Sequence, residues 1–91
     1  MQIVDASQGE WLERRRLEQL AYDLRRAIEA SLQGGAPQLA VALDTAREFL
    51  EQVLSEGETT ATRRGIARTR AEIALEVWRE KVGSLTRPRE T

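Results

Sequence analysis

Residues 17–32 read LEQLAYDLRRAIEASL, and the spacing of apolar residues in this stretch decides the fold class. Apolar side chains recur at intervals of three and four, which is the period of one face of an α-helix. A helical wheel collects them on one stripe: Leu17, Leu20, Ala21, Leu24, Ala27, Ile28 and Leu32. The other positions are mostly charged, so the segment is an amphipathic helix whose apolar side must be covered by other helices.

This first helix is predicted to extend over residues 8–33. Ser7 and Glu10 have the spacing of a capping box, in which the two side chains satisfy backbone N–H groups of the first turn. Gly34 is expected to adopt the left-handed conformation that ends many helices. Residues 1–7 then form an N-terminal arm.

A second helix is predicted over residues 37–55. Pro37 fits the first turn of a helix, where its missing N–H costs nothing, and Gly57 follows the end. Its apolar residues also repeat at intervals of three and four: Leu39, Ala42, Leu43, Ala46, Phe49, Leu50 and Val53. The helix is therefore expected to pack antiparallel to the first one, since the connection between them is short.

A third helix is predicted over residues 60–82, with Thr59, Thr60 or Thr62 as its cap and Gly83 after its last turn. Residues 84–91 are expected to form a flexible tail. The apolar residues of this helix cover about 180–200° of the wheel, which is wider than the stripe of an ordinary surface helix. The fold prediction is an all-α, up-down-up three-helix bundle spanning residues 8–83, completed by self-association into a larger bundle.

The composition excludes several functional classes. The 91 residues include no histidine and no cysteine, which removes the commonest general base, metal ligands and thiol nucleophile. We therefore predict a protein that is not an enzyme and binds no metal or cofactor. There is no apolar stretch of membrane-spanning length and no signal-peptide pattern, so the expected location is cytoplasmic. Thirteen arginines against one lysine indicate a GC-rich bacterial or phage source.

Positive charge gathers at the start of the third helix. The whole chain has a net charge of −1, but residues 1–57 carry −4 and residues 58–91 carry +3. The excess comes mainly from four arginines: Arg63, Arg64, Arg68 and Arg70. Three explanations stay open, namely pairing with glutamates of the second helix (Glu48, Glu51 and Glu56), contact with a nucleic-acid backbone, and a discrete anion site near the helix N-terminus.

Arg70 differs from the other three because it projects into the apolar arc of its helix. Burying an unpaired guanidinium there would be costly. Either its long side chain extends to water or to a carboxylate, or this part of the arc lies at a partner interface.

Two aromatic residues lie on the side of the first helix opposite its apolar stripe. Trp11 and Tyr22 are eleven residues apart and share this face. Aromatic residues of these types are enriched at binding hot spots, so both are candidates for a partner surface. The alternative is that Trp11 folds over the end of the bundle and Tyr22 is merely exposed.

The third helix offers two apolar edges, of which its own chain can cover one. The first edge holds Ile66, Ile73 and Val77, and the second holds Ala71, Leu75, Trp78 and Val82. We expect the second edge to lie at the surface, where Leu75, Trp78 and Val82 would form a two-fold homodimer interface.

The function favoured by these patterns is a non-catalytic protein–protein interaction module. Such a module would be an adaptor, regulator or small subunit of a larger bacterial or phage assembly, binding itself and another protein. The alternative is a small nucleic-acid-associated protein that uses the arginines of the third helix.

Overall fold

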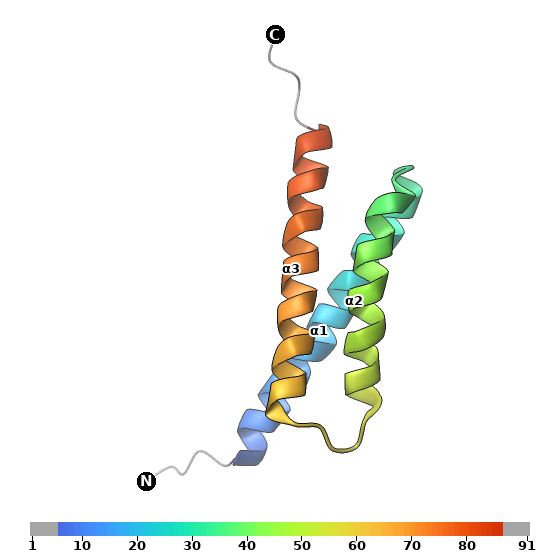
Figure 1. Ribbon diagram of the computed structural model, residues 1–91. Coiled ribbons are helices and arrows are strands. Elements are labelled where there is room, and N and C mark those ends of the chain that lie inside the picture. Colours follow the sequence, from blue (N-terminus) through green and yellow to red (C-terminus); the bar gives the residue numbers. More distant parts are fainter. Residues whose placement is uncertain (1–5, 87–91) are drawn as a thin grey trace.

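The computed structural model describes the backbone of residues 6–86 and the side chains of residues 11–83. Three helices follow one another: α1 (Ala6–Gln33), α2 (Pro37–Ser55) and α3 (Ala61–Thr86). No strand occurs between residues 6 and 86, so the all-α prediction is confirmed. Successive helices run in opposite directions, and α1 crosses behind the pair formed by α2 and α3 (Figure 1).

The core consists of aliphatic side chains from all three helices. The largest buried side chains are leucines of α1 and α2, whereas α3 contributes two alanines and one leucine. The buried apolar residues are Leu17, Leu20, Ala21, Leu24, Ala27, Ala40, Leu43, Ala46, Leu50, Val53, Ala67, Ala71 and Leu75. The predicted α1 stripe is correct except at its end, where Leu32 is exposed and Ser31 is buried in its place.

The buried Ser31 is tolerated because both of its hydrogen-bonding capacities are used. Its hydroxyl donates to the carbonyl of Ala27 at 2.8 Å and accepts a hydrogen bond from Trp78 Nε1 at 2.9 Å. The second bond ties the C-terminal half of α3 to the end of α1. A buried polar group that is satisfied in this way avoids the cost of desolvation.

The first helix starts two residues earlier than predicted, and it ends at the predicted Gln33. Ser7 lies inside the helix rather than capping it, because α1 already includes Ala6. At the other end Gly35, not Gly34, has the positive φ of 75°. The N–H of Ala36 bonds to the carbonyl of Ser31 and the N–H of Gly35 to that of Leu32, which is the Schellman arrangement with Gly35 at its left-handed position.

The third helix begins where expected and ends later than expected. Thr60 caps it, since its hydroxyl accepts a hydrogen bond from the Arg63 N–H at 3.1 Å. Gly83 does not stop the helix, which continues to Thr86. A glycine within a helix costs only about 1 kcal/mol relative to alanine, which is too little to end a helix by itself. The predicted arm and tail otherwise fall on residues 1–5 and 87–91, outside the described residues.

The prediction for the apolar edges of α3 is wrong in one respect. Leu75 is only 3% exposed and belongs to the chain's own core, so it is not a surface residue. Trp78 is partly buried against the same core, and Val82 is also half-buried. The other edge, with Ile66, Ile73 and Val77, is the one left exposed. The helix is rotated in this way because the core edge carries no charge, whereas the exposed edge includes Arg70.

Candidate functional site

The exposed edge of α3 has the spacing of a helix–helix contact. Ile66, Arg70, Ile73 and Val77 follow one another at intervals of four, three and four residues. Such spacing keeps side chains on one seam facing a second helix. The three aliphatic residues are 43–55% exposed. We call these four residues the α3 seam.

Arg70 occupies the middle of the α3 seam and stacks on an aromatic ring. Its guanidinium lies over the ring of Phe49 from α2, with its Cζ 4.9 Å from the ring centroid. Arg63 stacks on the same ring at 5.2 Å. Within residues 6–86 the Arg70 side chain makes no hydrogen bond or ion pair, so the attraction of the ring is its main internal contact.

The first two arginines of the basic cluster are paired inside the chain. Arg63 donates to both carboxylate oxygens of Glu56, at 2.8–3.1 Å. Arg64 Nε donates to Glu13 Oε1 at 2.6 Å, and its Nη1 donates to the carbonyl of Thr59 at 2.6 Å. Arg63 therefore pairs with one of the glutamates expected to compensate it, whereas Arg64 pairs with a glutamate of α1.

Of the other two glutamates named as partners, Glu48 is exposed and Glu51 binds arginines outside the cluster. Glu51 binds Arg25 of α1 and Arg47 of its own helix, and these hydrogen bonds, led by that from Arg25, hold the pKa of its carboxyl below the ordinary value. This ion pair stabilises the fold at neutral pH, and its contribution is lost as acid protonates Glu51. Arg68 lies 3.8 Å from Glu72 on the same helix.

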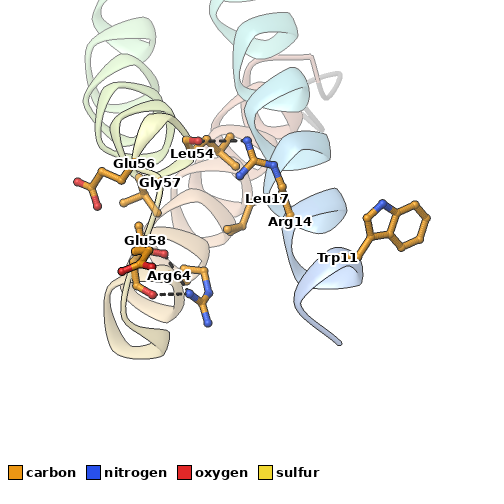
Figure 2. A pocket seen from close by; sticks show the side chains of 10 residues that line it. Trp11, Arg14, Leu17, Leu54, Glu56, Gly57, Glu58 and Arg64 are labelled. Atoms are coloured by element: carbon orange, nitrogen blue, oxygen red, sulfur yellow. Dashed lines mark hydrogen bonds between the residues drawn. The ribbon is translucent and has the colours of Figure 1, made fainter. Parts of the chain in front are cut away.

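A cleft of about 580 Å³ lies between the start of α1 and the loop that joins α2 to α3. Its floor is apolar, and charged groups surround its rim (Figure 2). Arg14 reaches across it to the carbonyl of Leu54 at 3.2 Å, and Arg64 closes the loop side. Trp11 points away from these residues in Figure 2. Both rim arginines thus bond to the backbone of the segment that runs from the end of α2 into the loop.

Replacing Arg64 with glutamine is expected to lower the free energy of unfolding by about 1–2 kcal/mol, because it removes a charged link between α3, α1 and the loop. Urea denaturation monitored by circular dichroism measures this loss. The matched control is Arg79→Gln, since Arg79 makes no ion pair or hydrogen bond within residues 6–86. Equal stability of the two variants would show that the Arg64 bonds contribute nothing.

The outer face of α1 is the second exposed surface. Trp11 is 56% and Tyr22 54% exposed. Each carries an arginine over its ring, with Arg15 Cζ 5.1 Å from the Trp11 centroid and Arg26 Cζ 5.8 Å from that of Tyr22. Neither aromatic residue folds into the core, so both stay candidates for a partner surface.

The residues predicted to form a partner surface do not lie together in the structure. Tyr22 and Trp78 line one groove between α1 and α3, while Trp11 lies eleven residues away along α1. Leu75 forms part of the groove floor. Ile66, Ile73 and Val77 lie on the exposed edge and not in the core as expected, and Arg70 among them is the sequence signal that this edge stays outside.

Within the described part of the chain, no group of three or more metal-ligating side chains gathers as a metal site. The described helices include none with the length and apolarity needed to cross a membrane. The chain matches no protein-family model, no curated protein and no solved structure.

Proposed function

We propose that this protein is a non-catalytic interaction module whose α3 seam binds an amphipathic helix of another protein, as an adaptor or small subunit would. The observation that carries the proposal is the exposure of Ile66, Ile73 and Val77 on a single line at helix-packing intervals. Isolated exposed aliphatic residues are ordinary, but a row of them on one face is characteristic of an association site.

Arg70 specifies the chemistry of the partner helix. A guanidinium in the middle of an apolar seam loses water when the seam is covered, and this cost requires a carboxylate opposite it. The stacked Phe49 ring holds the group in place, so less conformational entropy is lost when the pair forms. The expected partner is therefore a helix with an apolar stripe that is interrupted by one aspartate or glutamate.

Self-association through this seam is disfavoured by the same arginine. In a parallel pair the two Arg70 side chains would face each other, and in an antiparallel pair centred on the seam they would lie within one helical turn. The four seam residues include no carboxylate to compensate. Like charges brought together at an interface suppress that pairing, so a different protein fits the seam better than a second copy does.

A photo-crosslinking amino acid at position 73 is expected to capture the partner in cells of the source organism. The matched control places it at Arg68, which lies about 140° around α3 from Ile73. Crosslinking should occur at position 73, fail at position 68, and disappear when Val77→Glu is added. Capture at both positions, or at neither, would contradict the proposal.

The purified pair then gives a quantitative test. Ile73→Glu should weaken binding of the captured helix at least tenfold, which corresponds to about 1.4 kcal/mol. Its unfolding transition should stay unchanged, because Ile73 is 55% exposed in the free protein. Crosslinks at position 73 that join only copies of this chain would show that the seam is a self-contact.

A further inference from the structure

The outer face of α1 carries an internal repeat of eleven residues. Residues 11–18 read WLERRRLE and residues 22–29 read YDLRRAIE. Both units have an aromatic residue first, paired arginines at the fourth and fifth positions, and a glutamate at the eighth. Eleven residues make just over three full turns of a helix, so the second unit repeats the first on nearly the same face.

The repeat places one line of polar and aromatic groups along α1. The line begins with Trp11, Arg15 and Glu18 and continues with Tyr22, Arg26 and Glu29. All six residues are exposed. None of the four charged ones forms an ion pair within residues 6–86, although most other arginines near the bundle do.

The order of charges along this line is complementary to itself when the line is reversed. If Tyr22 is placed opposite Tyr22 of a second chain running antiparallel, Glu18 lies opposite Arg26 and Arg15 lies opposite Glu29. The two-fold axis repeats both pairs, so four charge pairs of opposite sign form and no like charges meet. Trp11 then faces Gln33 at each end of the contact.

The spacing of the line is also symmetric. From Trp11 to Gln33 the intervals are four, three, four, four, three and four, which read the same in both directions. An antiparallel copy therefore presents a side chain at every level where the first presents one, over about 33 Å of helix. We infer that α1 binds the α1 of a second copy through this face, forming an antiparallel two-fold homodimer centred on Tyr22.

This interface does not depend on the proposed function of the α3 seam. The line lies on the side of α1 turned away from the core, and the seam lies on α3 with Arg70 against α2. The two surfaces can be occupied together and tested separately. Because the α1 contact depends mainly on exposed charges, salt should weaken it strongly.

Charge reversal tests the register of the dimer. Sedimentation velocity at about 100 µM chain in low salt should give twice the 10.3 kDa chain mass for the wild type. Glu18→Arg should be monomeric, because the introduced guanidinium would face Arg26 of the other chain. Arg26→Glu should be monomeric for the corresponding reason, with two glutamates facing each other. An equimolar mixture of the two variants should recover the dimer mass, since each charge then meets its opposite.

The matched controls are Glu80→Arg and Lys81→Glu, which make comparable charge changes at exposed positions of α3 and should keep the wild-type mass. One molar salt should weaken the wild-type dimer at least tenfold. A monomeric wild type, dimeric single variants, or a mixture that stays monomeric would each overturn the inference. None of these results would affect crosslinking at position 73.

Discussion

Replacing Leu75 with glutamate is expected to unfold much of the protein at 25 °C. Leu75 is 3% exposed and packs with the alanines of α3 against α1 and α2. Burying a carboxylate there without a partner should lower the free energy of unfolding by about 4 kcal/mol or more, a large part of the total for a domain of this size. The loss of helical signal by circular dichroism, with and without urea, measures the effect.

Ile73→Glu is the control for this substitution. It makes a similar chemical change two residues away on the same helix, at a side chain that is exposed. It should keep the helical content and the urea midpoint of the parent. If both variants stay folded, or both unfold, the assignment of Leu75 to the core and Ile73 to the surface is wrong.

Leu24→Ala and Leu50→Ala are each expected to lower the free energy of unfolding by about 2–5 kcal/mol, which is the range for emptying a buried leucine site. Both side chains are completely inaccessible to solvent and lie in the core cluster that joins the helices. Chemical denaturation monitored by circular dichroism gives the two differences directly.

The control for these two substitutions is Leu32→Ala, which removes the same atoms from a leucine that is 57% exposed. It should change the stability by less than about 0.5 kcal/mol. A loss as large as that of Leu24→Ala would mean that Leu32 is buried, and would contradict the packing at the end of α1.

The helices and most of the core could be predicted because apolar residues repeat with the helical period. The stripe of α1 identifies Leu17, Leu20 and Leu24 directly, and α2 has the range expected for it. The rotation of α3 was harder to predict, because two neighbouring apolar edges compete for the core. The decisive difference is energetic, since the core can accept the edge with Ala71 and Leu75 without burying the charge of Arg70.

Contacts between distant segments were not predictable from the helical wheels. Arg64 binds Glu13, 51 residues away, and Trp78 binds Ser31, 47 residues away. Both contacts depend on the position of α3 along the axis of α1. A helical wheel does not contain this information, because it is a projection down the helix axis. The eleven-residue repeat on α1 is present in the sequence. That its side chains are exposed follows from the structure, because other residues of α1 form the core.

The alanines by which α3 meets the other helices also determine how strongly that helix is held. Ala67 and Ala71 are fully buried, but each removes little apolar surface from water compared with the leucines that join α1 to α2. We therefore expect the hairpin of α1 and α2 to be the more cooperative unit and α3 to open locally at a lower free energy. Elements of low local stability can adjust their packing at little cost, so the helix that carries the α3 seam would also be able to adapt to a partner of the kind proposed.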